Sequence, residues 1–187
     1  MRMRTFPIGG IHPSDNKEWS KGQAIEVLDL PNEVYVPMIQ HIGAPATPVV
    51  QKGDKVVTGQ IIGQSMGFVS ANIHSPISGV VTSVDAYPNG QGQRRMMVVI
   101  KREGDEWLEE IDRTTTLKRE CNLTPEEIVA KIKNAGIVGL GGAQFPTHVK
   151  LTIPDGQKAE VLVINGVECE PYLTSDYRNM VERAEMA

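Results

Sequence analysis

Short runs of β-forming residues, separated by Gly, Pro and Asn, fill the chain between residues 34 and 101. Such runs, punctuated by turn residues at roughly ten-residue spacing, are typical of a small all-β module. β-Branched side chains favour the pleated conformation, whereas Gly and Pro interrupt it. The sequence therefore predicts a β-rich module at 34–104, with strands in VYVPM (34–38), PVV (48–50), KVVTGQIIG (55–63), GVVTSV (79–84) and MMVVIK (96–101).

Two stretches of this module resemble the halves of a biotinyl- or lipoyl-type barrel-sandwich hybrid. They are KGDKVVTGQIIG (52–63) and ANIHSPISGVV (71–81). Carrier domains of that type need a modifiable Lys at the tip of the hairpin between the halves. The tip here, QSMGFVS (64–70), contains none, so we expect no swinging arm. His74 has no second His or Cys close to it in sequence, and we expect it to be structural and not a ligand.

The remaining residues before position 124 contain few apolar repeats, so we expect them to form little hydrophobic core of their own. Residues 1–33 include GGIHP and few apolar repeats, which indicates an extended arm. Residues 105–123 are charged and irregular, which indicates a linker. Aromatic residues make up only 5% of the chain, while Gly (18) and Pro (12) are frequent, and this favours short strands and tight turns over a helical bundle.

From Thr124 onward the sequence predicts a helix over 125–135. Thr124 can cap the first turn, Pro125 suits the first helical position, and Glu127 completes a capping box. Gly136 then supplies a left-handed stop. The apolar residues between these signals keep helical spacing, and they are Ile128, Val129, Ile132 and Ala135.

Two further elements are predicted near the end of the sequence. EVLVIN (160–165) is a short continuous apolar run, typical of a strand covered on both faces of an α/β sheet. The residues after it predict a second helix that is still running where the sequence stops, with apolar positions Tyr177, Met180, Val181 and Ala184. We therefore expect residues 124–187 to be the first, truncated part of an α/β domain.

Charge and composition exclude several classes of protein. The net charge of −4 argues against a nucleic-acid binder, which needs a basic face. The sequence contains no run of about 18 apolar residues that would span a bilayer. Its start, MRMRTFPIGG, has no apolar run of the kind that a secretory signal requires. Cys121 and Cys169 are isolated, so we expect two reduced thiols and no metal site.

A glycine-rich stretch at 136–150 is the first candidate site. Gly139, Gly141 and Gly142 leave their peptide N–H groups unshielded, so these groups can point at an anion such as phosphate. Lys150 supplies a positive charge nearby. The spacing fits neither Walker A nor the dinucleotide fingerprint. A tight turn between two elements is the alternative explanation.

An acidic loop directly after the predicted strand is the second candidate site. Loops beyond the carboxyl ends of strands are where open α/β sheets bind ligands. Asn165, Glu168 and Glu170 offer groups that can bond to sugar or ribityl hydroxyls. A solvated acidic turn is the alternative. Cys169 lies between the two carboxylates, and we expect it to be a packed thiol and not a nucleophile.

Taken together, these motifs resemble the RnfC family of the Rnf electron-transport complex. The similar strings are GGIHP (9–13), QHIGAPATPVVQKGDKVVTGQIIG (40–63), GFVSANIHSPISGVV (67–81), AGIVGLGGAQFPTHVKL (135–151) and VINGVECEPYLTSDYR (163–178). The resemblance implies a complex that moves electrons between ferredoxin and NAD and couples this transfer to ion pumping. It implies a subunit peripheral to the cytoplasmic face of the membrane that handles NADH, with FMN and, further along, two 4Fe-4S clusters. The implied partners are the other Rnf subunits, including integral membrane ones, with ferredoxin indirectly and no nucleic acid.

The second half of the sequence is also similar to the flavin-binding subunit of respiratory complex I, which has GRGGAGFPTGLK and NADESEP. By that likeness, the phosphate-side loop comprises Gly139, Gly141, Gly142, Ala143, Phe145, Pro146, Thr147 and Lys150. The flavin- and nicotinamide-facing loop comprises Asn165, Glu168, Glu170 and Pro171. Leu140 replaces an Arg and Val167 replaces an Asp, so those two side-chain contacts do not carry over. The cluster-binding cysteines of the family do not occur in this sequence.

The expected fold is therefore mixed α+β and α/β, a barrel-sandwich-hybrid module followed by the start of an FMN- and NADH-binding domain. The expected function is electron relay between NADH, FMN and iron–sulfur clusters, with no catalytic acid or base, and this piece alone is expected to be inactive. Two alternatives stay open. One is a related cobalamin-reducing flavoprotein, and the other is a scaffold protein of such a complex that has lost its flavin.

Overall fold

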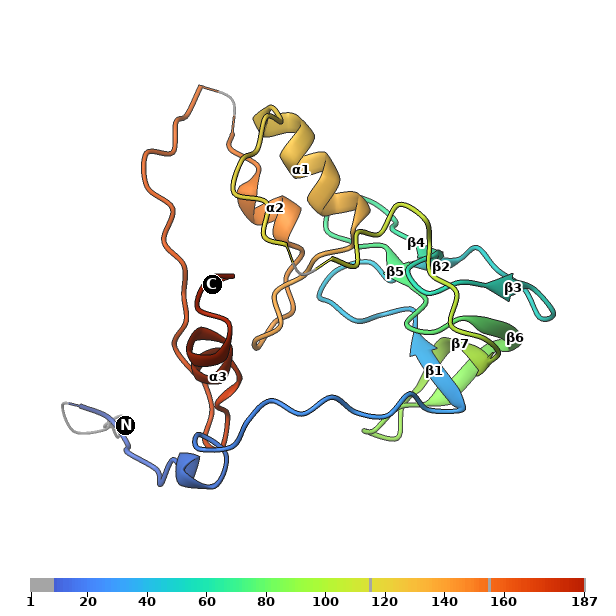
Figure 1. Ribbon diagram of the computed structural model, residues 1–187, viewed down its shortest axis with the longest axis horizontal. Helices are drawn as coiled ribbons and strands as arrows, with labels where there is room; N and C mark the ends of the chain where they lie inside the picture. The colour runs from blue at the N-terminus through green and yellow to red at the C-terminus, as the bar shows by residue number, and fades with distance from the viewer. Residues whose placement is uncertain (1–8, 115, 155, 187) are drawn as a thin grey trace, which may run out of the picture. The chain divides into compact units, whose positions relative to one another are not determined.

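The computed structural model describes residues 9–114, 116–154 and 156–186, which belong to two compact units (Figure 1). The β unit is Asp29–Glu160 and contains every strand of the described residues together with two helices. The terminal unit combines Met1–Leu28 with Val161–Ala187, the two ends of the chain. Each unit is described by itself.

Two antiparallel sheets make up the β unit (Figure 1). The larger sheet has the order β1-β7-β6-β3, with β1 at Glu33–Pro37, β3 at Lys55–Val56, β6 at Gly79–Pro88 and β7 at Arg94–Arg102. The smaller sheet has the order β2-β4-β5, with β2 at Thr47–Pro48, β4 at Ile61–Gln64 and β5 at Ile73–His74. The predicted β-rich module is confirmed, and β5 is a strand that the sequence did not predict.

The pairing of β6 with β7 is the longest in the molecule as described. It runs from Gly79 opposite Arg102 to Pro88 opposite Arg94, with an irregularity between Val81 and Ser83. β1 adds to the free side of β7, and β3 adds to the free side of β6. The strands of the smaller sheet are short, so β6 and β7 take part in most of the strand pairing of this unit.

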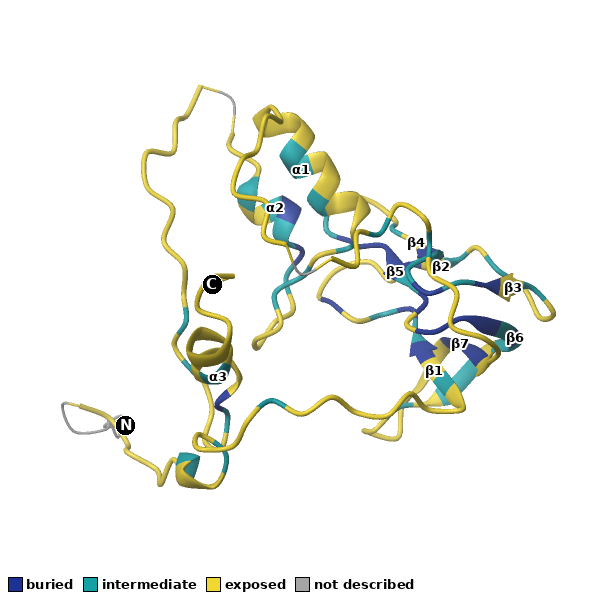
Figure 2. Cartoon of the chain, in the orientation of Figure 1, coloured by how far each residue is buried: buried dark blue, intermediate teal, exposed yellow. Residues whose placement is uncertain are grey.

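The hydrophobic core lies between the two sheets and is drawn in dark blue in Figure 2. Fully buried side chains come from both sheets, and they include Met38, Ile62, Val81, Val98 and Ile100. The backbone of Gly63 approaches this core so closely that an added methyl group would lie 2.8 Å from the Met38 sulfur and 3.2 Å from Ile73 Cβ. A larger residue at this position would have to displace the Met38 side chain.

The first part of the segment after β7 packs against the turn between β3 and β4. The Thr58 amide donates to the Glu106 carbonyl at 3.0 Å, and the Leu108 amide donates to the Thr58 carbonyl at 2.9 Å. The Ile111 side chain occupies the space where Gly59 would carry a side chain. Further along, the Arg113 guanidinium stacks 4.5 Å above the Trp107 ring.

Helix α1 (Pro125–Asn134) confirms the predicted helix and its capping box. The Thr124 hydroxyl accepts from the Glu127 amide at 3.3 Å, and the Glu127 carboxylate accepts from the Thr124 amide at 2.8 Å. The other helices are α2 (Thr147–Leu151), α3 (Ser175–Glu182) and a short 3-10 turn at Lys17–Trp19. No helix of the described ranges is long and apolar enough to cross a membrane.

Two predictions about the end of the chain are wrong. Residues 160–165 form no strand, and Val161, Val163 and Ile164 are 78%, 82% and 77% exposed. A strand exists only when a neighbour supplies hydrogen bonds, and no described segment pairs with this run. Helix α3 ends at Glu182 and does not continue to the last residue. A helix this short without a packed face frays at its end, because few hydrogen bonds oppose the entropy of the chain.

The buried core predicts how the β unit responds to truncated side chains. Ile62 is fully buried, so Ile62→Ala should lower the free energy of unfolding by about 2–5 kcal/mol through the cavity that it leaves. Ile42 of the same unit is 52% exposed, and Ile42→Ala is the matched control, with an expected change within about 0.5 kcal/mol. Urea unfolding followed by circular dichroism measures both. Equal losses in the two variants would contradict the assigned core.

Candidate functional site

The glycine loop, residues 137–146, connects α1 to α2. Helix α1 ends at Asn134, and Gly136 follows its C-cap residue with a φ of +65°, the left-handed conformation that glycine adopts without strain. The Gly136 amide donates to the Lys133 carbonyl at 3.0 Å, and the Ile137 amide donates to the Ile132 carbonyl at 3.3 Å. The predicted helix stop is therefore confirmed, and it sets the direction in which the glycine loop leaves the helix.

The base of the glycine loop is closed by its own backbone. The Gly139 amide donates to the Phe145 carbonyl at 2.9 Å, and the Thr147 amide donates to the Ile137 carbonyl at 3.0 Å. Val138 and Pro146 face each other as an antiparallel bridge between these two bonds. Sequence reasoning placed the Gly139 amide among those that point at an anion. In the structure this amide is already used within the loop.

The tip of the glycine loop is open. Leu140, Gly141, Gly142 and Ala143 are all exposed, and Leu140 is exposed to 92%. A methyl group added at Gly141 or Gly142 would meet nothing within 4 Å. The amides of these four consecutive residues donate no hydrogen bond to any residue that the structure describes. The tip of the loop therefore offers a run of backbone donors that no described residue uses. The base of the loop, by contrast, is closed by its own backbone hydrogen bonds.

Lys150 of helix α2 lies beside this loop. Its Nζ is 2.8 Å from the position that a Cβ on Gly139 would occupy. The lysine forms no ion pair with another residue of the described ranges. Of the predicted phosphate-side residues, the structure therefore brings Lys150 and Gly139 into contact. Glycine at position 139 is what makes room for the ammonium group.

The acidic loop, residues 165–171, belongs to the terminal unit. The side chains of its two glutamates differ in burial and in hydrogen bonding. The Glu168 Oε1 accepts from the Tyr177 amide in the first turn of α3 at 3.1 Å, while its Oε2 is buried without a hydrogen-bond partner among the described residues. The Asn165 Oδ1 accepts from the Val167 amide at 3.0 Å, which folds the loop on itself. The Glu170 side chain is exposed. Cys169 is exposed as well, so the expectation of a packed thiol is wrong.

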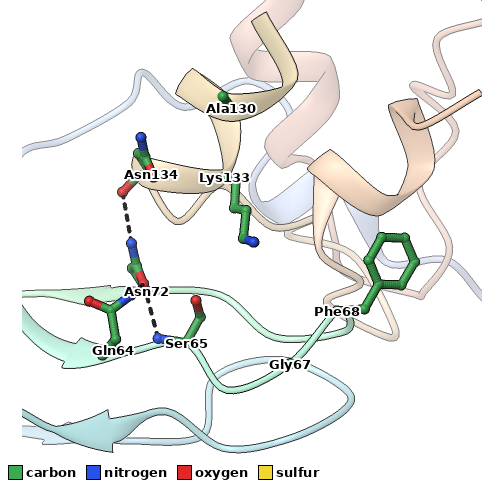
Figure 3. Close-up of a pocket in the computed structure, with 8 residues that line it drawn as sticks. All are labelled: Gln64, Ser65, Gly67, Phe68, Asn72, Ala130, Lys133 and Asn134. Atoms are coloured by element: carbon green, nitrogen blue, oxygen red, sulfur yellow. Dashed lines mark hydrogen bonds between the residues drawn. The ribbon is translucent and has the colours of Figure 1, made fainter. Parts of the chain in front are cut away.

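Asn72 and His74 of the β unit lie against the end of α1. The Asn72 Nδ2 donates to the Asn134 carbonyl at 3.2 Å (Figure 3). Burial lowers the pKa of His74, and a hydrogen bond with the Asn134 backbone opposes this shift. Within the described ranges, no group of three or more His, Cys, Asp or Glu residues is arranged to hold a metal ion.

The N-terminal arm braces the acidic loop, a role that sequence reasoning missed. The Lys17 Nζ donates to the carbonyls of Glu170 and Leu173, and the Tyr172 amide donates to the Asp15 carbonyl at 2.7 Å. The rings of Trp19 and Tyr172 are 5.6 Å apart. These contacts join residues more than 150 positions apart in the chain, which no local pattern encodes.

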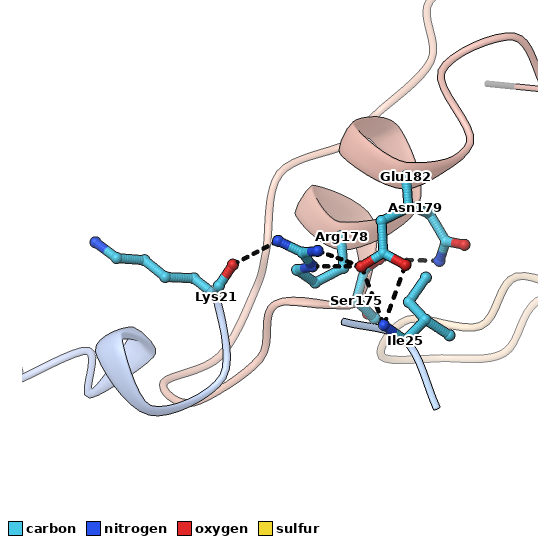
Figure 4. Close-up of polar contacts among 6 residues, drawn as sticks. All are labelled: Lys21, Ile25, Ser175, Arg178, Asn179 and Glu182. Carbon is cyan, nitrogen blue, oxygen red and sulfur yellow. Dashed lines mark hydrogen bonds and ion pairs between the residues drawn. The ribbon is translucent and has the colours of Figure 1, made fainter. Parts of the chain in front are cut away.

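Helix α3 is tied to the same arm (Figure 4). The Glu182 carboxylate accepts from the Ile25 amide at 3.0 Å and pairs with Arg178, whose Nη1 donates to the Lys21 carbonyl at 2.8 Å. The hydrogen bond from Arg178, together with that from Ile25, lowers the pKa of Glu182. The terminal unit therefore gives Glu168 a fixed support. The glycine-loop residues and the acidic-loop residues lie in different units.

Comparison with known proteins identifies both halves of the chain. The family model of the RnfC barrel sandwich hybrid domain matches residues 5–105. The family model of the Nuo51 FMN-binding domain matches residues 132–187, a range that contains both candidate loops. The barrel-sandwich match covers the β1–β7 region described above.

Individual relatives match nearly the whole chain. The C subunit of the proton-translocating ferredoxin:NAD(+) oxidoreductase complex of Clostridium ljungdahlii is 47% identical over 178 residues, which is 95% of this chain and 38% of that protein. Its counterpart in the Na(+)-translocating complex of Acetobacterium woodii is 46% identical, over 95% of this chain and 40% of that protein. The counterpart in the ion-translocating oxidoreductase complex of Rhodobacter capsulatus is 43% identical, over 98% of this chain and 35% of that protein.

The chain thus spans less than half the length of the curated relatives that it matches. Its RnfC domain match alone extends over more than half of its residues, and the three relatives described above are C subunits of such complexes. The chain belongs to the RnfC family.

Proposed function

We propose that the protein carrying this chain is the electron-transfer RnfC component of an ion-translocating ferredoxin:NAD oxidoreductase complex, and that the glycine loop holds the phosphate of FMN. The observation that carries the proposal is the run of amides at Leu140–Ala143 that donate to no described residue, with the Lys150 ammonium beside the adjacent Gly139. This run lies inside the segment matched by the FMN-binding domain. The names of the relatives support the assignment of the complex.

The donors at the glycine loop suit a phosphate monoester. Consecutive peptide N–H groups at an exposed turn form a concave set of partial positive charges, and an ammonium group adds a full charge. Gly141 and Gly142 carry no side chain that would keep phosphate oxygens away from the backbone. Leu140 stands where the complex I relative has an Arg, so Lys150 is the cation that this loop brings to the phosphate.

The acidic loop would serve the ring and hydroxyl side of the nucleotides. Glu168 has one oxygen bonded to the α3 backbone and a second, buried oxygen without a partner among the described residues. A buried acceptor that lacks a donor is costly, and a ligand hydroxyl or N–H would remove that cost. Asn165 and the exposed Glu170 add acceptors from the same loop. We assign to these three residues the orientation of the flavin and of NAD(H).

The role of this chain in the reaction is to bind and orient. When bound, FMN supplies the conversion between the hydride chemistry of NADH and the one-electron chemistry of iron–sulfur clusters. Hydride transfer needs no general acid or base, and we assign none. The cluster-binding cysteines of the family are absent from this sequence, so we assign the 4Fe-4S clusters to other parts of the full-length protein.

The proposed setting is the cytoplasmic face of the membrane, where the RnfC protein would be peripheral. Its partners would be the other Rnf subunits, including integral membrane ones, and ferredoxin would be reached indirectly. The relatives are named as subunits of ion-translocating complexes, which is the support for these partners. The two alternative functions are a cobalamin-reducing flavoprotein and a scaffold without flavin. The experiments below test whether the chain binds flavin at the proposed loop.

The free tip amides predict a selective loss of flavin binding in the full-length protein. Gly141→Val should weaken FMN binding about 10- to 100-fold, because the side chain blocks charge-assisted hydrogen bonds from the backbone. The added Cβ meets nothing within 4 Å, so the melting temperature should not change. Gly90→Val is the control at an equally open turn of the β unit. Quenching of FMN fluorescence gives the affinity, and an unchanged affinity in Gly141→Val would favour the scaffold.

The position of Lys150 predicts a difference between two flavins. Lys150→Met should weaken FMN binding by about tenfold, because a charge-assisted bond to the phosphate is lost. The affinity for riboflavin, which lacks the phosphate, should stay the same in this variant. Lys150→Arg keeps the charge and should retain most of the FMN affinity. An equal loss for both flavins would show that Lys150 acts on the ring or on the fold instead.

A further inference from the structure

The β4–β5 loop, residues 65–72, contacts the chain at both ends of the segment that carries the glycine loop. Figure 3 shows the contact at the first end, between Asn72 and Asn134. In carrier domains with a barrel-sandwich hybrid fold, the corresponding hairpin tip bears the modified lysine. Here the tip has no lysine and faces α1 and α2 of its own chain. Its contacts therefore need another explanation.

Asn72 holds the first end of the segment, which is the end of α1 at Asn134. Its Nδ2 donates to the Asn134 carbonyl at 3.2 Å. Its Oδ1 accepts from the Ser65 amide at 3.0 Å and from the Gln64 side chain at 3.0 Å. The side chain is 5% exposed and is bonded on both sides, so its amide has one defined orientation.

Gly136 fits against this same residue. A methyl group at position 136 would lie 2.3 Å from the Asn72 carbonyl oxygen, closer than any side chain can approach backbone. The φ of +65° adds a second requirement for glycine. The start of the glycine loop is therefore seated directly on the backbone of the β4–β5 loop.

His148 holds the second end of the segment. It lies on α2 and is 3% exposed, and its Nε2 donates to the Phe68 carbonyl at 3.1 Å. Because a carbonyl only accepts, the ring carries a proton on Nε2. The Nδ1 is buried without a partner in the described part of the chain. The Phe68 ring stands edge-on to the imidazole at 6.4 Å.

These two attachments are points and not a continuous interface. A groove of about 650 Å³ lies between the β4–β5 loop and α1, and Lys133 and Phe68 are among the residues that line it (Figure 3). A packed interface would spread the binding energy over many contacts, so no single one would matter. The open groove leaves few restraints on the two ends. The Asn72 bond and a hydrogen bond of His74 with the Asn134 backbone hold one end, and the His148 bond holds the other.

We infer that Asn72, Gly136 and His148 are positioning residues that clamp the glycine loop to the β4–β5 loop and hold its tip amides ready for phosphate. The inference rests on the proposed function of the glycine loop. Fixing both ends of a flexible segment raises the fraction of molecules in the binding-competent conformation. The apparent affinity for a ligand rises by the same factor.

The first test uses two glycines in the full-length protein. Gly136→Ala should release the clamp, while Gly53→Ala is the control, since Gly53 also has a positive φ of +97° but meets nothing within 4 Å. Hydrogen exchange at the Gly139 and Thr147 amides, which close the loop, should become faster only in Gly136→Ala. FMN affinity should fall about fivefold or more in Gly136→Ala and stay within about twofold in Gly53→Ala.

The second test uses His148. His148→Leu removes the donor to Phe68 and should weaken FMN binding about fivefold. His148→Gln places an amide N–H near the same carbonyl and should restore most of the affinity. If either the glycine or the histidine replacement prevents folding, Asn72→Asp is used in its place. This change keeps both accepted bonds and sets a carboxylate oxygen against the Asn134 carbonyl, which breaks that attachment.

Two readouts separate failure of the clamp from failure of the proposed function. Unchanged exchange at Gly139 and Thr147 in both the glycine and the histidine variants would overturn the clamp. Faster exchange with unchanged FMN affinity would show that the contacts are structural only, and it would overturn the positioning role. If the unaltered protein binds no FMN while exchange still responds, the clamp stands and the flavin assignment fails.

Discussion

The antiparallel pairing of β6 with β7 is the interaction on which the β unit depends. It supplies the long backbone ladder to which β1 and β3 add, and it contributes Val81, Val98 and Ile100 to the core. The smaller sheet has only short strands and gains its stability by packing Ile62 and Ile73 against the same core. Because Ile62 of β4 and Ile73 of β5 are packed in the core, the loop that joins these two strands is held at both of its ends. This attachment at both ends is what allows the loop to support α1 and α2.

The glycine loop divides its backbone groups between two tasks. The Gly139 and Thr147 amides close the base of the loop, and the amides from Leu140 to Ala143 at the tip donate to none of the described residues. A loop that used all its donors internally would have none for a ligand, and one that used none would lack a defined shape. The proposed phosphate site depends on this division, and the clamp at Asn72 and His148 would preserve it. Under this proposal the β module would act as a support for the nucleotide loop, which gives a physical reason for joining the two domains in one chain.

The sequence predicted the features whose cause is local. The capping box of α1, its stop at Gly136 and most of the β runs depend on neighbouring residues, and the structure has them. The strand expected at 160–165 was wrong because strand formation depends on a partner, which apolar character alone does not provide. The bond from His148 to Phe68 and the bond from Lys17 to Glu170 depend on tertiary contacts, and the bond of the Gly139 amide depends on how the glycine loop folds back on itself. The sequence shows which residue types stand at 17, 139 and 148, but it does not show which partners they bond to. The assignment of FMN to the glycine and acidic loops stays a prediction.

The exposed run Val161–Ile164 has a consequence for how this part of the protein behaves in concentrated solution. Its four apolar residues include β-branched ones, and their peptide groups pair with no strand among the described residues. Such a segment is a template for intermolecular β-sheet, because a second copy can supply the hydrogen bonds that the first one lacks. A protein sample in which this run stays exposed is therefore prone to aggregate through Val161–Ile164. A Lys or Pro placed within it would act as a gatekeeper and keep the protein dispersed.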